Sequence, residues 1–138
     1  MNKLSEKRIL IADDEPSVRS LVRRFLSDYV VLDAEDGEEA VRIALSQKPD
    51  LILMDIMMPR VDGYTACYTI KAEPISWGIP IVMLTALDHK LNVKFGKDMG
   101  ADGYITKPFT RKDVLDMVGQ LLRSAKEDIE TQTTPTIP

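Results

Sequence analysis

The chain has 138 residues, of which 44% are hydrophobic and 29% charged, values typical of a single globular domain that buries its own core. Its net charge of −4 and pI near 5.0 argue against direct binding of this segment to a nucleic-acid backbone. One cysteine and one histidine exclude a disulfide framework and disfavour a zinc site, and the lack of a signal-peptide or membrane-spanning pattern predicts a cytoplasmic location without membrane contact.

Five short apolar runs are predicted to form strands. Two of them, "DLILMD" and "PIVMLTA", are apolar along nearly their whole length, as is typical of strands buried on both faces of a parallel sheet. In chain order the runs are "RILIAD" (8–13), "YVVLDA" (29–34), "DLILMD" (50–55), "PIVMLTA" (80–86) and "DGYITK" (102–107).

Segments with helical periodicity separate these strands, and Thr110 is the predicted N-cap of the last one. The predicted helices cover residues 17–28, 37–47, 64–73, 89–99 and 111–127. Alternation of strands and helices, with right-handed crossovers, predicts a doubly wound α/β domain. We therefore expect an open five-stranded parallel sheet with helices on both faces.

Polar residues stand where four of these strands end. They are Asp13 and Asp14 after the first strand, Asp55 at the end of the third, Thr85 in the fourth and Lys107 in the fifth. The carboxyl ends of parallel strands meet at one edge of the sheet, where such folds bind ligands. Carboxylates suit Mg²⁺ and a lysine suits phosphate, so a site for both is predicted. The alternative, that the first two acids lie in a solvated loop, is less favoured because it leaves the other residues unexplained.

Four motifs resemble the receiver domain of bacterial two-component response regulators, over about residues 7–124. They are "ILIADDEPSVR" (9–19), "DLILMDIMMPRVDGY" (50–64), "IPIVMLTA" (79–86) and "GADGYITKPF" (100–109). The resemblance implies a flavodoxin-like (βα)5 fold with strand order 2-1-3-4-5. It also implies that Asp55 accepts a phosphoryl group from the phosphohistidine of a histidine kinase, in a signalling domain that catalyses only its own phosphotransfer and slow dephosphorylation.

The resemblance implies a Mg²⁺ cofactor, for which Mn²⁺ can substitute. Asp13, Asp14 and Asp55 would supply carboxylate oxygens, and Met57 would supply its backbone carbonyl. The side chain of Met57 would not take part.

The resemblance further implies a phosphate-binding and switching group. Lys107, the Thr85 hydroxyl and the Ala86 backbone N–H would bind phosphate oxygens, and Tyr104 would move together with Thr85. The Lys107–Pro108 bond would be cis. The alternatives are that Thr85 and Tyr104 are ordinary strand residues, since both types favour strands.

Partners and boundaries also follow from the resemblance. A sensor histidine kinase or phosphotransfer protein would phosphorylate the chain, and the face of the fourth helix, fifth strand and fifth helix would control an output domain or effector. Gly103 and Met117 replace residues typical of dimerising members, so we expect a monomer or a weak, phosphorylation-dependent dimer. Residues 1–125 would form the receiver domain, and the Thr/Pro-rich residues 126–138 a disordered tail or linker.

Two alternative functions also explain an aspartate at the end of an apolar strand. A haloacid-dehalogenase-like phosphatase would need a second acid two residues after Asp55, where Met57 stands, and a cap domain for which no residues remain. A receiver-like module that is never phosphorylated would not need the complete set of acids, threonine and lysine. Both alternatives are therefore less favoured.

Overall fold

Five parallel strands form one sheet in the computed structural model, which describes residues 6–86 and 97–133. The strands are β1 (Arg8–Ala12), β2 (Val30–Ala34), β3 (Leu51–Asp55), β4 (Ile81–Ala86) and β5 (Gly103–Lys107). Their order is β2-β1-β3-β4-β5, which confirms the predicted fold class and topology. The chain passes from β1 outward to β2 and then back to β3, so the switch point of the sheet lies between the carboxyl ends of β1 and β3.

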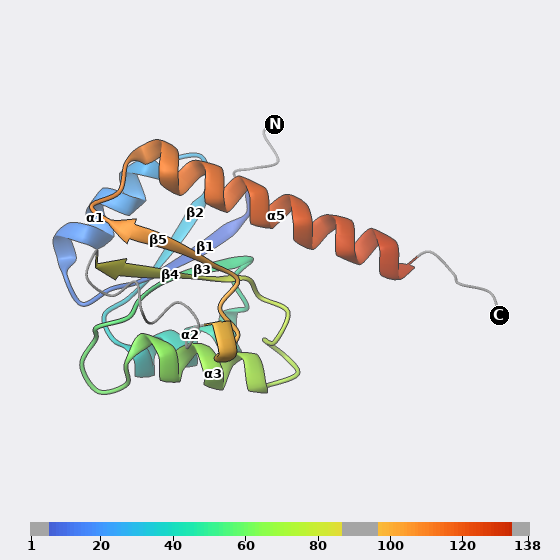
Figure 1. Ribbon diagram of the computed structural model, residues 1–138, viewed down its shortest axis with the longest axis horizontal. Coiled ribbons are helices and arrows are strands. Elements are labelled where there is room, and N and C mark those ends of the chain that lie inside the picture. The colour runs from blue at the N-terminus through green and yellow to red at the C-terminus, as the bar shows by residue number, and fades with distance from the viewer. Residues whose placement is uncertain (1–5, 87–96, 134–138) are drawn as a thin grey trace.

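Helices cover both faces of this sheet, as predicted. They are α1 (Pro16–Phe25), α2 (Gly37–Gln47), α3 (Gly63–Ala72) and α5 (Arg111–Thr133). Figure 1 shows α1 and α5 on one face and α2 and α3 on the other. The predicted helix over 89–99 falls largely on residues 87–96, outside the described part of the chain. Within that part, no helix has the length and apolar character needed to cross a membrane.

Alternate residues of the strands belong to two separate hydrophobic cores, one on each face of the sheet. In β3, Leu51 and Leu53 pack with α1 and α5, whereas Ile52 and Met54 pack with α2 and α3. Every residue of β3 is buried. This double burial explains why the strand sequences are continuously apolar, because each face of the sheet needs its own apolar layer.

Two helix ends differ from the prediction by more than one residue. The first helix was expected over 17–28 but ends at Phe25, because Leu26 leaves helical geometry with φ −101° and ψ 36°. The last helix was expected to end at residue 127 but continues to Thr133, into the stretch predicted as an irregular tail. Its last turns contain Ala, Lys and Glu and neither Gly nor Pro, so nothing local stops the helix there. The domain boundary at residue 125 stays a prediction.

Candidate functional site

The carboxyl ends of β1, β3 and β5 bring two acids and one lysine together. Lys107 Nζ lies 3.0 Å from Asp13 Oδ2 and 3.2 Å from Asp55 Oδ1. Asp13 is fully buried and Asp55 is 6% exposed. An ammonium group therefore bridges two buried carboxylates at the switch point of the sheet, where the sequence predicts that they meet.

The segment between β1 and α1 is fixed by hydrogen bonds around Asp13. Its Oδ1 accepts a hydrogen bond from the Glu15 backbone N–H at 2.9 Å, and its backbone carbonyl accepts one from Arg19 Nη1 at 2.7 Å. Pro16 then begins α1, a position that proline favours. The carboxylate oxygens of Asp13, Asp14 and Glu15 lie within 4.8 Å of one another, the first buried and the other two exposed.

The site holds more negative than positive charge. Burial and the neighbouring carboxylate of Asp13 raise the pKa of Asp55 to about 6, although Lys107 acts in the opposite direction. Burial by itself would lower the pKa of Lys107, but the hydrogen bonds and charges of Asp13 and Asp55 outweigh it and raise that pKa. An additional cation would relieve the repulsion among the carboxylates.

A hard divalent cation fits this donor set. The buried Asp13 and the exposed Asp14 present carboxylate oxygens within 4.8 Å of each other, and oxygen is the ligand that Mg²⁺ prefers. Glu15 belongs to the same group of oxygens, while Asp55 is joined to Asp13 through Lys107. Met57 lies in the segment that follows β3, and its side chain points largely to solvent, with 65% of the residue exposed.

The predicted phosphate-binding residues lie on neighbouring strands. Thr85 is paired in register with Thr106, and Ala86 with Lys107, so all of them stand at the same edge of the sheet. Thr85 is 4% exposed, and its hydroxyl donates to the Ala86 carbonyl at 3.2 Å. The Lys107–Pro108 bond is cis, as the sequence predicts.

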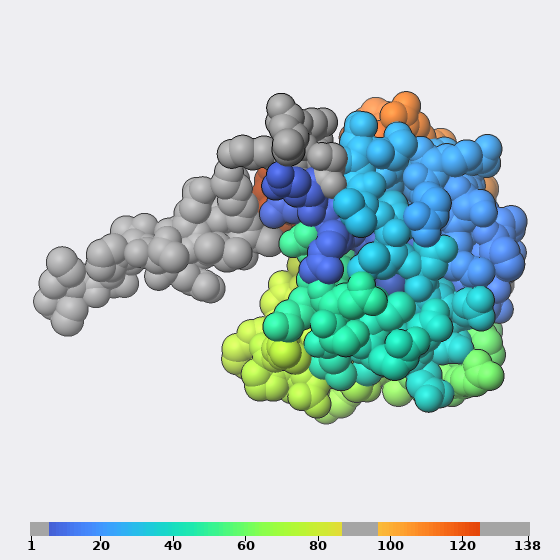
Figure 2. All heavy atoms as spheres, turned by 180° about the vertical axis from the view of Figure 1, so that it is seen from behind, coloured from blue at the N-terminus to red at the C-terminus, as the bar shows by residue number. Residues whose placement is uncertain are grey.

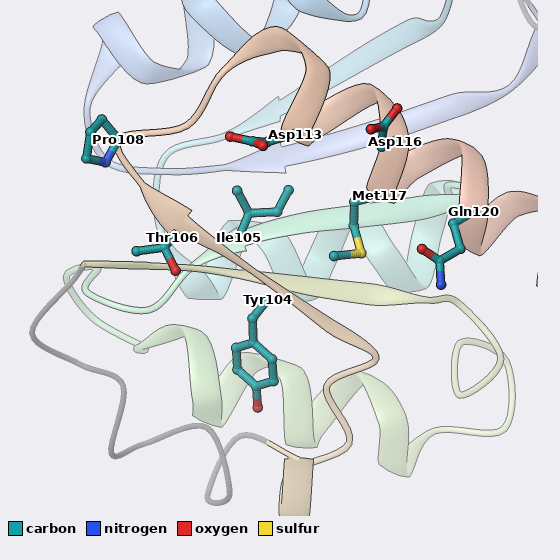
Figure 3. Close-up of a pocket in the computed structure, with 8 residues that line it drawn as sticks. All are labelled: Tyr104, Ile105, Thr106, Pro108, Asp113, Asp116, Met117 and Gln120. Atoms are coloured by element: carbon teal, nitrogen blue, oxygen red, sulfur yellow. The ribbon is translucent and has the colours of Figure 1, made fainter.

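Tyr104 and Ile105, consecutive residues of β5, point to opposite sides of the sheet (Figure 3). The Tyr104 ring points toward α3 and packs on the core between the sheet and α2 and α3, where burial raises its pKa to about 12. Ile105 packs with Val114 and Val118 of α5. Between β5 and α5 lies a cavity of about 470 Å³, lined by Tyr104, Ile105, Thr106, Pro108, Asp113, Asp116, Met117 and Gln120.

The two departures noted on this face, Gly103 and Met117, are in contact with each other. A Cβ atom added at Gly103 would lie 2.9 Å from Met117 Sδ, closer than real Cβ atoms come. The methionine sulfur therefore occupies the place where a larger residue on β5 would lie. The face between β5 and α5 therefore has a close contact between a glycine and a methionine at these two positions.

Sequence analysis did not identify Arg19 as part of the site. Its side chain is only 13% exposed, and besides Asp13 it lies 4.0 Å from carboxylate oxygens of both Asp33 and Glu35. Arg23 and Arg24 on the same helix are exposed, so an arginine in this stretch carries no sequence signal that separates a buried role from a surface one.

Comparisons with known proteins agree on one family. A sequence model described as the response regulator receiver domain matches residues 9–119. The chain is 41% identical over 122 residues to the alkaline phosphatase synthesis transcriptional regulatory protein PhoP of Bacillus subtilis, an alignment that covers 87% of this chain and 50% of that protein. The chain thus spans about half the length of the curated relatives it matches.

Solved structures of response regulators and receiver domains superpose on this chain. A putative response regulator from Chloroflexus aurantiacus superposes with a TM-score of 0.81 at 32% identity, over 85% of this chain and 98% of that one. The receiver domain of the sensor histidine kinase PA1611 from Pseudomonas aeruginosa superposes with a TM-score of 0.78 at 31% identity, over 84% of this chain and 97% of that one. That structure has a magnesium ion coordinated in its active site cleft.

Proposed function

Because this chain belongs to the response regulator receiver domain family of two-component signalling systems, we propose that its function is to accept a phosphoryl group on Asp55. The observation that carries this proposal is the bridge from Lys107 to the buried carboxylates of Asp13 and Asp55. A structural ion pair needs one acid, whereas this lysine serves two at the ligand-binding edge of the sheet.

The proposed reaction is a phosphoryl transfer from the phosphohistidine of a sensor histidine kinase or a phosphotransfer protein. An Asp55 carboxylate oxygen attacks phosphorus, the P–N bond breaks, and its electron pair returns to the imidazole of the donor. Lys107 stabilises the charge on the transferred group, while the Thr85 hydroxyl and the Ala86 N–H bind its oxygens. The chain supplies positioning and charge for its own modification only.

Mg²⁺ is the cofactor that we propose, with Mn²⁺ able to substitute. Asp13, Asp14 and Asp55 would hold it through carboxylate oxygens, and Met57 through its backbone carbonyl. When bound, the ion would supply the positive charge that lets a carboxylate approach a negative phosphoryl group. The raised pKa of Asp55, caused by its burial and by Asp13, supports a need for that charge.

Signal output would use the face around β5 and α5. Phosphorylation would draw the Thr85 hydroxyl toward the phosphate and shift the position of Tyr104, biasing an equilibrium that already exists. The partner that reads this change would be an output domain or a separate effector in the cytoplasm, without direct nucleic-acid or membrane contact by this segment. We propose a monomer or a weak, phosphorylation-dependent dimer, because Gly103 and Met117 fill part of the face with apolar contact.

The test is phosphorylation by a small-molecule phosphodonor in the presence of Mg²⁺, followed by intact-mass analysis. The parent should gain one phosphoryl group, and Asp55→Asn should gain none. Asp28→Asn, which alters an exposed aspartate, serves as the control and should be labelled like the parent. Labelling that persists in Asp55→Asn would place the acceptor elsewhere, and no labelling of the parent would favour the receiver-like module that is never phosphorylated.

A further inference from the structure

The segment of residues 56–62 joins β3 to α3 and follows directly on Asp55. Its backbone begins directly after Asp55 and ends where the Gly63 N–H donates to the Ile56 carbonyl at 2.8 Å. A Cβ atom at Gly63 would lie 2.2 Å from the Asp55 carbonyl oxygen, so α3 begins in direct contact with the backbone of the phosphoacceptor. We call residues 56–62 the acceptor loop.

The N-terminus of α2 contacts the acceptor loop from the other side. A Cβ atom at Gly37 would lie 1.9 Å from the Val61 carbonyl oxygen, which means that the two backbones touch. Next to this contact, Arg60 Nη1 lies 2.7 Å from Asp36 Oδ2. In Figure 1, α2 and α3 run side by side on the same face of the sheet, and in Figure 2 the surface of α2 adjoins the segment that follows α3.

Arg60 has an unusual backbone for a residue with a side chain. Its φ of +67° lies in the left-handed region, which is unfavourable for residues other than glycine. Inside the loop, the Val61 N–H donates to the Pro59 carbonyl at 2.8 Å and so closes a tight turn around Arg60. From outside the loop, Asp36 contacts the Arg60 side chain and adds to the support of this turn.

Asp36 is well placed to hold the loop because its own position is fixed. Its Oδ1 accepts a hydrogen bond from the Glu39 backbone N–H at 2.8 Å and so caps α2, which leaves Oδ2 for Arg60. The Asp36 side chain is 11% exposed, whereas that of Arg60 is 66% exposed. The Glu39 N–H, and with it the Arg60 guanidinium, hold the pKa of Asp36 below its usual value, so the carboxylate stays charged.

We propose that Asp36 and Arg60 are positioning residues for the acceptor loop, and that their ion pair sets the affinity of the neighbouring acidic site for a divalent cation. This inference rests on the proposed function, because it takes the Met57 carbonyl in this loop as a cation ligand. The pair holds the turn at Arg60, and the turn fixes where the loop presents its carbonyl groups. By reciprocity, a bound cation strengthens the contact between α2 and the loop.

The experiment is a Mg²⁺ titration of the whole chain, followed by the amide NMR signals of Ile56 and Gly63. Asp36→Asn keeps an oxygen for the Glu39 N–H but loses the charge, and Arg60→Gln loses the charge from the other side. Each variant should weaken Mg²⁺ binding about threefold, the scale of one partly exposed ion pair. The double variant should bind no more weakly than either single one, because both remove the same interaction.

Two further variants distinguish a loss of Mg²⁺ affinity from a general loss of fold stability. Arg60→Lys keeps a positive charge at this position, so it should bind Mg²⁺ with most of the parent's affinity. Arg42→Gln should leave it unchanged, since Arg42 contacts Glu39 on the same surface at 3.4 Å and no loop residue in the contacts described. Thermal unfolding of each variant is measured in parallel without metal.

The outcomes are distinct. Unchanged Mg²⁺ affinity in Asp36→Asn and Arg60→Gln overturns the inference, and does so even if their unfolding temperatures fall, because that pattern marks a purely structural pair. Additive losses in the double variant overturn it as well. If Asp36→Asn does not fold, the variants at the exposed Arg60, Arg60→Gln and Arg60→Lys, decide the question.

The parent chain separates this inference from the proposed function. A parent that binds no Mg²⁺ overturns both the inference and the proposed cofactor. If the parent binds Mg²⁺ and is phosphorylated while the variants bind Mg²⁺ equally well, only the role proposed for the ion pair is wrong.

Discussion

At the scale of single residues, the burial of Asp55 lowers the stability of the folded state at neutral pH. Asp55 is buried beside Asp13 and has Lys107 as its cation, but that cation is shared with Asp13. The result is a carboxyl group whose pKa is raised to about 6 by burial and by its acidic neighbour. Ionising this group at neutral pH costs free energy in the folded state, and the same negative charge is what a phosphoryl acceptor needs.

We predict that Asp55→Asn makes the fold more stable at pH 7. The folded pKa of about 6 lies above the ordinary value of 3.8, so the folded state binds this proton more tightly than the unfolded state does. The penalty is fully present above pH 6 and is lost as the pH falls toward 4. In chelator-treated buffer the asparagine variant should gain on the order of 2 kcal/mol at pH 7 and about half of that at pH 5.

Urea unfolding at the two pH values measures this difference, with Asp28→Asn as the exposed control. An asparagine variant that is less stable than the parent at pH 7 would mean that Lys107 neutralises Asp55 completely. If the difference in unfolding free energy between the asparagine variant and the parent does not become smaller at pH 5, a group other than Asp55 causes that difference.

A second prediction concerns the lifetime of the phosphorylated state. Met57 lies two residues after Asp55, is 65% exposed, and has no group that can hydrogen-bond a water molecule strongly and orient it toward phosphorus. We expect Met57→Asn to lose phosphate about tenfold faster, equivalent to about 1.4 kcal/mol of barrier. Intact-mass analysis over time gives the rate. Met57→Leu is the matched apolar control and should decay like the parent; equal rates for all three proteins would show that this position does not control water. Leu87, two residues after Thr85 in the sequence, is the second position that we expect to flank the approach of water, and it lies outside the described residues.

At the scale of elements, the first turns of α2 and α5 have different surroundings. The α5 helix begins with a reciprocal cap, in which the Asp113 N–H donates to Thr110 Oγ1 at 3.1 Å and the Thr110 N–H donates to Asp113 Oδ2 at 2.9 Å. The N-cap predicted at Thr110 is therefore confirmed. The α2 helix is also capped, by Asp36 Oδ1, which accepts from the Glu39 N–H at 2.8 Å, and in addition its first residue, Gly37, lies against the Val61 carbonyl. A glycine in α2 thus serves close packing, whereas Gly119 in the middle of α5 does not.

This contrast predicts opposite effects of the same substitution. Gly37→Ala would place Cβ 1.9 Å from the Val61 carbonyl oxygen, and should destabilise the fold by about 2 kcal/mol or more, because backbone must move. Gly119→Ala would place Cβ 3.2 Å from Arg123 Nη1, the movable end of a long side chain. It should stabilise the fold by about 0.5–1 kcal/mol, the usual gain for alanine over glycine inside a helix. Urea unfolding of both variants tests the pair, and a shift of the same sign in both would refute the assignment of Gly37 to close packing.

The sequence predicts elements of this fold better than their ends. Strands such as β3 are evident because residues buried on two faces must be apolar throughout, and this signal does not depend on distant contacts. The end of α1 at Phe25 depends on how Leu26 turns toward β2, and no residue type marks that turn. In the site, Asp13, Asp55 and Lys107 stand out as polar residues that end apolar runs. Arg60 does not, because an arginine in a loop looks the same in sequence whether or not it has a fixed partner.

At the scale of the whole molecule, two cores lie on opposite faces of one sheet, and Asp55, the proposed phosphoacceptor, ends the strand between them. The α1 and α5 face and the α2 and α3 face each pack on alternate residues of the same strands. Asp55 ends the central strand, so a change at its carboxylate adjoins the acceptor loop on one side and Lys107 of β5 on the other. A phosphoryl group carried by Asp55 would therefore lie beside both the acceptor loop and Lys107.

The last prediction concerns how much of the chain the fold needs. The residues that make up the two described cores begin at Ile9 and end at Leu122, although α5 continues to Thr133. A shortened chain of residues 1–125 retains all of them, so it should fold on its own with an unfolding temperature within about 2 °C of the full chain, because it keeps every residue of the two described cores. Shortening instead to residues 1–117 removes Val118, Leu121 and Leu122, and should lower the unfolding temperature by more than about 10 °C or abolish folding. Circular dichroism during heating compares the three proteins. If the 1–125 chain unfolds far below the full chain, residues 126–138 belong to the folded domain rather than to a tail or linker.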